Sequence, residues 1–265
     1  MSGRLAGKAA IVVGAGQTPG DTIGNGRATA MLFAREGARV LAVDRRLDSA
    51  KETVEAIARE GGEAAPFEAD ATREADAAAA VAACVERFGR LDVLHNNVGI
   101  GGGDAGPAHV EEADWDRILA VNLKSVVFPC KAALPVMRAQ RAGAITNVSS
   151  IAAVCSTGIV AYKTSKAGVN AYTQSLAIGN AKHGIRANVI MPGLMNTPMA
   201  IEGISAARGI PREELVRQRD AQVPLGKMGT AWDVAHAAVF LASDEAAFIT
   251  GVALPVDGGQ SARIG

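Results

Sequence analysis

Residues 12–29, VVGAGQTPGDTIGNGRAT, join a short apolar run to a segment with helical spacing. Glycines at positions 14, 16, 24 and 26 let the chain turn sharply, and they let a helix that starts here approach a ligand closely. The backbone N–H groups at the start of such a helix attract a phosphate group. We therefore interpret the stretch as a pyrophosphate-binding loop, although its glycines are spaced more widely than usual.

Apolar runs and helix-like segments alternate beyond this loop. Short apolar runs predict strands over residues 9–13, 39–44, 64–69, 91–95, 144–148 and 187–191. Helical spacing predicts helices over residues 27–36, 47–60, 74–88, 113–139 and 160–182. This alternation is typical of an α/β fold, a Rossmann-type doubly wound parallel sheet with helices on both faces. We expect a single domain over residues 1–265, with a substrate lid at about residues 194–229 that contains one short charged helix (211–222).

Composition argues against several classes of protein. The chain has 27 basic and 27 acidic residues, a formal net charge of zero, and dispersed basic residues, so we expect no nucleic-acid partner. Its apolar runs are too short for a membrane span and its N-terminal run too short for a secretory signal, so we expect a cytoplasmic protein with no membrane partner. The three cysteines and four histidines are scattered, which suggests no metal site.

An acidic residue ends the second predicted strand. Asp44 lies 18 residues beyond Gly26, near the spacing expected for the carboxylate that binds the adenosine ribose of a dinucleotide. A carboxylate there accepts hydrogen bonds from the ribose hydroxyls and repels a 2′-phosphate, which favours NAD over NADP. Arg45 and Arg46 leave NADP open, because a neighbouring arginine accommodates that phosphate.

A second chemical signal is the pair Tyr162 and Lys166. Their i, i+4 spacing puts them on one face of a helix. The reference pKa of tyrosine is about 10, so acid–base work near pH 7 needs a shift of roughly 3 units. An adjacent lysine cation and the positive charge of an oxidised nicotinamide would lower the pKa of Tyr162 in this way.

These motifs together resemble the short-chain dehydrogenase/reductase family, in the branch with a Tyr-x-x-x-Lys active site. The resemblance covers essentially the whole chain. Besides the glycine loop and the Tyr–Lys pair, it rests on Asp70, Asn96-Asn97-Val98-Gly99, Asn122, Ser149-Ser150, Pro192-Gly193-Leu194-Met195-Asn196-Thr197 and Val256-Asp257-Gly258-Gly259. In sequence order and at nearly the family spacing, these motifs are specific as a set.

The resemblance implies a role for each matching residue. Tyr162 is the general acid–base on the substrate oxygen, Lys166 lowers its pKa and holds the nicotinamide ribose, and Asn122 supports a proton relay through water. Asp70 and Ala71 flank the adenine, and Met195 and Thr197 meet the nicotinamide carboxamide. The full set expected to bind the cofactor is Gly14, Gly16, Thr22, Ile23, Gly24, Gly26, Asp44, Asp70, Ala71, Asn97, Val98, Gly99, Tyr162, Lys166, Pro192, Gly193, Met195 and Thr197.

The catalytic serine is either Ser149 or Ser150. Ser150 precedes Ile151-Ala152-Ala153, as the catalytic serine of the family does, whereas Ser149 has the usual spacing of 13 residues to Tyr162. Adjacent residues at a strand end point in opposite directions, so only one faces the substrate. We choose Ser150, and we expect Cys155 in the following loop to be a buried inert thiol.

The long glycine loop can be aligned with the family in two ways. Gly14, Gly24 and Gly26 reproduce the usual endpoints with six extra residues. Alternatively, residues 22–26 resemble the enoyl reductase branch, in which Thr22 and Ile23 would touch the pyrophosphate. We expect residues 17–21 to bulge over the pyrophosphate, so that deleting residues 17–22 preserves folding but changes NAD affinity.

The resemblance implies an NAD-dependent oxidoreductase that interconverts a secondary alcohol and a ketone. The alternatives are an NADPH-dependent 3-oxoacyl thioester reductase, against which Asp44 argues, and a dinucleotide-binding regulator without turnover. The family also leads us to expect a homotetramer. The sequence carries no motif that names the substrate.

Overall fold

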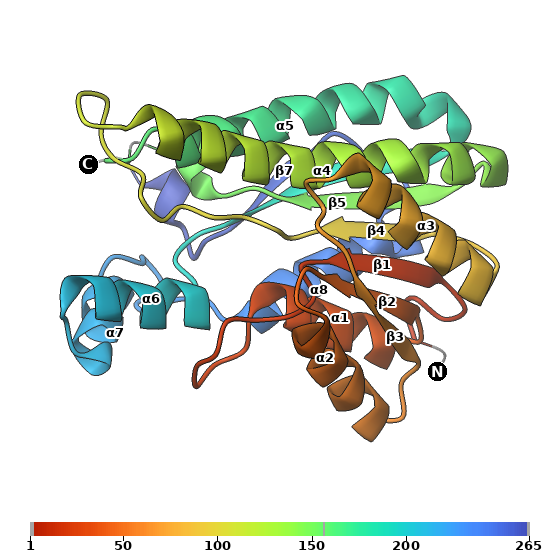
Figure 1. Ribbon diagram of the computed structural model, residues 1–265, viewed down its shortest axis with the longest axis horizontal. Coiled ribbons are helices and arrows are strands. Elements are labelled where there is room, and N and C mark those ends of the chain that lie inside the picture. The colour runs from red at the N-terminus through yellow and green to blue at the C-terminus, as the bar shows by residue number, and fades with distance from the viewer. Residues whose placement is uncertain (1–2, 156, 264–265) are drawn as a thin grey trace.

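The computed structural model describes residues 3–155 and 157–263, which form a seven-stranded parallel sheet between two layers of helices (Figure 1). The strand order is β3-β2-β1-β4-β5-β6-β7, and all six neighbouring pairs are parallel. The strands are β1 (Ala9–Val13), β2 (Arg39–Asp44), β3 (Ala64–Glu68), β4 (Val93–Asn96), β5 (Gly143–Val148), β6 (Ile185–Pro192) and β7 (Ala253–Val256). This confirms the expected doubly wound α/β fold.

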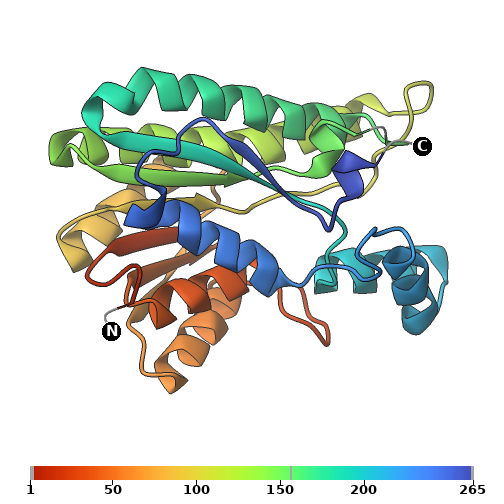
Figure 2. The same cartoon turned by 180° about the vertical axis from the view of Figure 1, so that it is seen from behind.

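Helices cover both faces of the sheet. Helices α3, α4 and α5 lie on one face, and α1, α2 and α8 lie on the other (Figures 1 and 2). The helices are α1 (Asn25–Arg35), α2 (Leu47–Arg59), α3 (Glu74–Phe88), α4 (Glu112–Gln140), α5 (Ala161–Asn180), α6 (Pro198–Arg208), α7 (Arg212–Asp220) and α8 (Ala231–Ala242). Four single-turn 3₁₀ segments complete the chain: η1 (Ile151–Ala153), η2 (Ala181–His183), η3 (Asp244–Ala246) and η4 (Gln260–Ala262).

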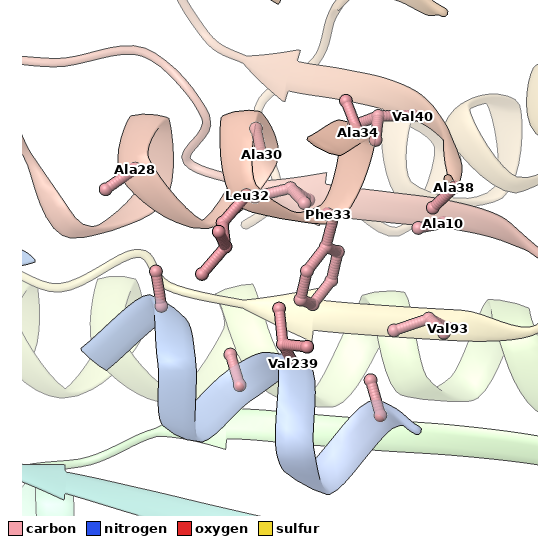
Figure 3. Close-up of a cluster of buried hydrophobic side chains, with 14 of the residues drawn as sticks. Ala10, Ala28, Ala30, Leu32, Phe33, Ala34, Ala38, Val40, Val93 and Val239 are labelled. Atoms are coloured by element: carbon pink, nitrogen blue, oxygen red, sulfur yellow. The ribbon is translucent and has the colours of Figure 1, made fainter. Parts of the chain in front are cut away.

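The sheet is buried on both faces, and its strand β1 is apolar throughout. All five residues of β1, the sequence AAIVV, are buried, as expected for a parallel strand between two helical layers. On the α1/α8 face, Leu32 and Phe33 point toward α8 and Val239 points back at them (Figure 3). Each face therefore carries its own apolar core, and the polar motifs are left to the ends of the strands.

Local signals account for several helix ends. Gly37 follows α1 with φ +87° and Gly89 ends α3 with φ +78°, conformations that glycine adopts without a Cβ penalty. At the start of α8, Thr230 and Asp233 form a capping box, in which each side chain accepts a hydrogen bond from the other's backbone N–H.

The lid differs from the sequence prediction. We predicted one short helix between residues 194 and 229, but the structure has two, α6 and α7, which project beyond the carboxyl ends of the strands (Figure 1). Pro198 stands at the first position of α6, where its missing N–H costs no hydrogen bond. Around Ile201, Leu215, Val223 and Met228 the lid has a small core of its own.

Helix α4 meets the length and composition expected of a membrane span, contrary to our sequence-based expectation. Its 29 residues include a window with a mean hydropathy of 1.3. One face of α4 is buried against the sheet and its neighbouring helices, and that face carries the polar side chains of Asn122 and Ser125. These features are those of a helix in a protein core, and one such helix is weak evidence for a membrane span.

Candidate active site and cofactor cradle

The sequence-predicted site residues come together at one edge of the sheet. They follow the carboxyl ends of β1 to β6, the edge at which open α/β sheets bind ligands. The glycine loop follows β1, Asp44 ends β2, and Asp70 follows β3. The remaining predicted groups follow β4, β5 and β6 or lie on α4 and α5 beside them.

The glycine loop brings α1 unusually close to β1. A Cβ added at Gly26 would lie 1.8 Å from the Gly14 carbonyl oxygen, so no larger residue fits there. Gly14 has φ +77°, which also favours glycine. The N-cap of α1 is Gly24, which has no side chain to cap the helix, and the first turn carries no acidic residue. The N-terminus of α1 is therefore suited to an anion.

Gln17 closes the extra segment of this loop. Its side-chain Oε1 accepts a hydrogen bond from the Gly24 N–H at 3.1 Å. Its backbone N–H donates to Ser49 Oγ at 2.9 Å, and the Arg46 guanidinium donates to its carbonyl oxygen. The bulge, residues 17–24, is thus a closed loop that is fastened to the start of α2.

The tip of the bulge contacts the lid. A Cβ added at Gly20 would lie 2.8 Å from Glu202 Cγ and 2.9 Å from Pro198 Cβ, both on α6. Asp21 is paired with Arg212 of α7 at 3.5 Å, and Arg212 is also paired with Glu202 at 3.2 Å. The loop extends from the sheet edge toward α6 in both views (Figures 1 and 2). The bulge therefore connects the glycine loop to the lid.

Asp44 lies against the glycine loop from the end of β2. Its Oδ2 accepts a hydrogen bond from the Gly16 N–H at 3.0 Å, and its Oδ1 accepts from the Arg46 N–H at 3.0 Å. The Arg46 side chain extends to Gln17 and Ser49 of the loop and helix beside it. The carboxylate is thus held between the glycine loop and the start of α2.

Polar atoms left without partners suit a dinucleotide along this edge. Within the described residues, Thr22 Oγ1, Asn25 Oδ1 and Asn196 Oδ1 are buried and have no hydrogen-bond partner. Thr22 and Asn25 flank the N-terminus of α1, and Asn196 lies between β6 and α6. Buried polar atoms are normally hydrogen-bonded. Together with the glycine cradle and Asp44, these atoms fit a pyrophosphate-containing cofactor.

The residues after β3 and β4 complete the cofactor side of the edge. Asp70 Oδ1 accepts hydrogen bonds from the Thr72 N–H and hydroxyl, which lower the pKa of the Asp70 carboxyl. Ala71, next to Asp70 after β3, is buried. After β4, Asn97 Nδ2 donates to the Gly14 carbonyl oxygen at 3.3 Å, and a Cβ on Gly14 would lie 3.0 Å from Val98 Cγ2. The loop after β4 is therefore packed directly on the glycine loop.

The segment after β6 is more enclosed than the sequence suggested. A Cβ on Gly193 would lie 2.4 Å from Gln260 Oε1, which also accepts the Leu194 N–H at 2.8 Å. The Met195 side chain is buried in the α1/α8 core, so it faces away from the open edge. Pro192 ends β6, and Thr197 is buried at the N-cap of α6.

Tyr162 and the two serines meet after β5. Ser150 forms a hydrogen bond with the phenol that lowers the pKa of Tyr162, but burial outweighs it and raises the pKa above its ordinary value. Ser149 points the other way and donates to the Lys166 carbonyl oxygen at 2.8 Å. Cys155, in the loop that follows, has a free thiol that is partly exposed, so the expectation that it is buried is wrong.

Lys166 and Asn122 lie beside the tyrosine. The Lys166 ammonium lies 5.7 Å from the centroid of the Tyr162 ring and donates to the Val148 carbonyl oxygen at 3.0 Å. Burial lowers the pKa of Lys166 to about 8. Asn122 donates to Ser165 Oγ and the Ile100 carbonyl oxygen and accepts the Ile100 N–H. The expected lowering of the Tyr162 pKa by Lys166 is thus not a leading influence in this structure, because burial opposes it and the ammonium faces a carbonyl.

Sequence reasoning missed two residues of this edge. Gln17 was expected only as part of a bulge, and its role in closing the loop had no motif to reveal it. Asp104, three residues beyond Gly101, accepts backbone hydrogen bonds from the start of α5, a contact between residues more than 50 positions apart.

Among residues 3–155 and 157–263, no group of three or more His, Cys, Asp or Glu side chains is arranged to hold a metal ion.

Comparison with known proteins places the chain in a family. Residues 21–261 match the family model described as enoyl-(acyl carrier protein) reductase. The chain is 38% identical over 268 residues to 2,5-dichloro-2,5-cyclohexadiene-1,4-diol dehydrogenase from Sphingobium indicum, with all of both chains covered. It is 37% identical over 261 residues to the 3-oxoacyl-[acyl-carrier-protein] reductase of Thermotoga maritima, with 97% and 98% of the two chains covered.

A solved structure agrees. A short-chain dehydrogenase/reductase from Burkholderia xenovorans superposes with a TM-score of 0.91 at 42% identity, covering 99% of this chain and 100% of that one. Members of this family use nicotinamide dinucleotide cofactors, in keeping with the cradle described above. The sheet order, the site residues and the relatives agree that the chain belongs to the short-chain dehydrogenase/reductase family of oxidoreductases.

Proposed function

We propose that this protein is an NAD-dependent dehydrogenase that interconverts a secondary alcohol and a ketone. The observation that carries the proposal is the grouping of Ser150, Tyr162 and Lys166 beside the glycine cradle. Each of these groups has a defined task in moving a proton on or off a substrate oxygen. The similarity to a diol dehydrogenase, whose substrate carries secondary hydroxyls, adds support.

The chemistry divides between the cofactor and the chain. A bound NAD would supply the acceptor for the hydride that leaves the substrate carbon. Tyr162 accepts the hydroxyl proton in oxidation and returns it in reduction, and the Ser150 hydroxyl orients the substrate oxygen toward the phenol. Lys166 would hold the nicotinamide ribose, and Asn122 would support the path by which the proton leaves for solvent.

The test is oxidation of a panel of secondary alcohols, with Tyr162→Phe as the variant. We expect kcat to fall by about 10²- to 10⁴-fold in Tyr162→Phe, the usual contribution of general acid–base catalysis, while NADH binding is kept. NADH binding without turnover in both proteins would instead favour a dinucleotide-binding regulator.

We infer NAD rather than NADP from Asp44. Asp44 ends β2 and its carboxylate contacts the glycine loop, and a carboxylate there would repel a 2′-phosphate. The Arg46 guanidinium donates to the Gln17 carbonyl oxygen and does not neutralise the Asp44 carboxylate. The negative charge that would repel a 2′-phosphate is therefore kept, which also supports NAD. Comparing the Kd values of NADH and NADPH tests this inference, and tighter binding of NADPH would reverse it.

A 3-oxoacyl thioester reductase is the second candidate. The 37% identity to such an enzyme from Thermotoga maritima favours it. Asp44 counts against it, because we expect that activity to use NADPH. Reduction of a 3-oxoacyl thioester at a higher kcat/KM than any simple ketone would favour this candidate.

A further inference from the structure

The helix that carries Tyr162 begins without a cap of its own. Helix α5 starts at Ala161, and its N-cap residue, Val160, has no side chain that can accept a hydrogen bond. The first N–H groups of a helix have no partner inside the helix. Tyr162 is the second residue of α5, so its backbone N–H is one of these groups.

Asp104 supplies the missing cap from the loop between β4 and α4. Its Oδ2 accepts a hydrogen bond from the Tyr162 N–H at 2.7 Å. Its Oδ1 accepts from the Ala161 N–H at 3.1 Å and from the Val160 N–H at 3.3 Å. A carboxylate at a helix N-terminus also interacts favourably with the helix dipole. Asp104 thus accepts from three consecutive N–H groups at the start of α5.

The same loop contacts the phenol ring and Asn122. A Cβ on Gly101 would lie 3.2 Å from Tyr162 Cδ2, so the loop backbone lies against the ring. The N–H and carbonyl of Ile100 are both bonded to the Asn122 side chain, at 2.8 and 2.9 Å. Residues 100–104, the Asp104 loop, therefore fix Tyr162 at both its backbone and its ring.

We propose that Asp104 is a positioning residue for Tyr162: its carboxylate fixes the first turn of α5 and so sets the place of the phenol relative to Ser150. The proposal rests on the proposed function, in which Tyr162 moves the proton. Asp104 acts through backbone contacts and does not act on the substrate. Displacement of a reacting group by about 1 Å costs on the order of 100-fold in rate, which gives the scale of the expected effect.

Asp104→Asn tests the proposal with little change in volume. Its amide nitrogen cannot accept a backbone N–H, so the cap loses one of its two acceptors. We expect kcat to fall about 10- to 100-fold. The Kd of NADH should stay within a factor of about three, because the residues around the glycine loop are untouched.

The matched control is Asp92→Asn. The Asp92 carboxylate also accepts a backbone N–H, from Ala9 at 2.9 Å, but it precedes β4 at the opposite end of the sheet. This variant should lose stability without losing kcat. A kcat loss in Asp92→Asn equal to that in Asp104→Asn would overturn a specific role for Asp104.

A double-mutant cycle separates positioning from general destabilisation. In a Tyr162→Phe background, Asp104→Asn should lower kcat by less than about twofold, because the group it positions is already gone. The full 10- to 100-fold loss in that background would contradict the proposal.

Titration of Tyr162 by its phenolate absorbance tests the positioning role of Asp104 without measuring turnover. The chain has only two tyrosines, so in a Tyr172→Phe background the phenolate absorbance reports Tyr162 alone. Asp104→Asn should shift the pKa of Tyr162, because a displaced phenol changes both its burial and its hydrogen bond to Ser150. An unshifted titration overturns the positioning role. Wild-type protein that binds NADH and oxidises no alcohol overturns the proposed function, and the titration still tests Asp104.

Discussion

Tyr162 and Lys166 sit in surroundings that favour their neutral forms. Burial raises the pKa of the phenol and lowers that of the ammonium to about 8. Ionisation of Tyr162 near neutral pH therefore needs a positive charge close to the phenol and a hydrogen bond to its oxygen. Ser150 supplies the hydrogen bond, and Lys166 is the cation that lies beside the ring.

Ser150 and Ser149 should differ sharply when each is replaced by alanine. Ser150→Ala removes a hydrogen bond that lowers the pKa of Tyr162, so we expect kcat to fall about 10- to 100-fold and the phenol to titrate at higher pH. Ser149→Ala removes a hydrogen bond to the Lys166 carbonyl and should cost about 1 kcal/mol of stability with a near-normal kcat. Steady-state kinetics and urea unfolding measure both, and the reverse pattern would make Ser149 the catalytic serine.

His95 should make stability depend on pH. It is fully buried in β4, and burial lowers its pKa from 6.5 to about 3. Between these pH values the unfolded chain binds a proton that the folded chain does not. His95 therefore does not reduce the free energy of unfolding above about pH 6.5. Below that pH the free energy of unfolding falls progressively as the pH approaches 3.

Urea unfolding at pH 7, 6 and 5 checks this prediction. The free energy of unfolding should fall more steeply for wild type than for His95→Gln, by at most about 1.4 kcal/mol per pH unit for one proton. His109, which is exposed, provides the control, and His109→Gln should follow wild type. Parallel curves for wild type and His95→Gln would show that burial does not suppress protonation.

At the scale of elements, the glycine loop and the lid form one connected unit. Gln17 closes the bulge, Ser49 and Arg46 fasten it to α2, and its tip packs on α6. We propose that a movement of the lid would be transmitted to the glycine loop through this contact.

Deletion of residues 17–22 should remove the contact between the glycine loop and the lid. We expect the chain to fold, the Kd of NADH to rise, and trypsin to cut faster at the arginines of α6 and α7, because the lid loses its support from the bulge. Asp21→Ala is the control and should change the Kd of NADH less than about fivefold, since exposed ion pairs contribute about 0–1 kcal/mol. Unchanged affinity and unchanged cleavage in the deletion would mean that the bulge has no such role.

At the scale of the molecule, an apolar patch lies at the β7 edge of the sheet. It consists of Ile178, 79% exposed, Phe248, fully exposed, and Val252. Gly251 packs near Ala177 of α5, which brings the two segments together. Edge strand β7 presents backbone groups beside this patch. We propose that the patch is covered by another copy of the chain in the expected homotetramer.

Light scattering tests the tetramer. Wild type should have four times the 27.1 kDa mass of one chain, and Phe248→Asp should reduce that mass, because a charge in an apolar interface is costly. Lys51→Asp on α2, on the side of the sheet that carries β3, should leave the mass unchanged. A monomeric wild type would refute the proposal.

The sequence predicted strands β1 to β6 but not β7 or α8, and it predicted the lid poorly, for physical reasons. Runs such as AAIVV are buried on both faces, so composition alone marks them as strands within one or two residues. The segment of α6 begins at Pro198 and contains Gly203, residues that are typical of loops, whereas its contacts with the bulge and with α7 support a helix. No local pattern could reveal Asp104, whose partners are 56 to 58 residues away. Spacing also put Lys166 beside Tyr162 but could not show that its ammonium faces Val148.

The packing of α1 on α8 has a consequence for the order in which the protein is made. Leu32 and Phe33 of the first helix point toward α8, and they share a buried cluster with Val239 of that last helix (Figure 3). During synthesis, the apolar face of α1 leaves the ribosome long before α8, the helix that covers it, because α8 lies about 200 residues later in the chain. Translation adds about 5–20 residues per second. The apolar face of α1 therefore stays exposed in the nascent chain for about ten seconds or more. We expect chaperone binding or aggregation to compete with folding during that time.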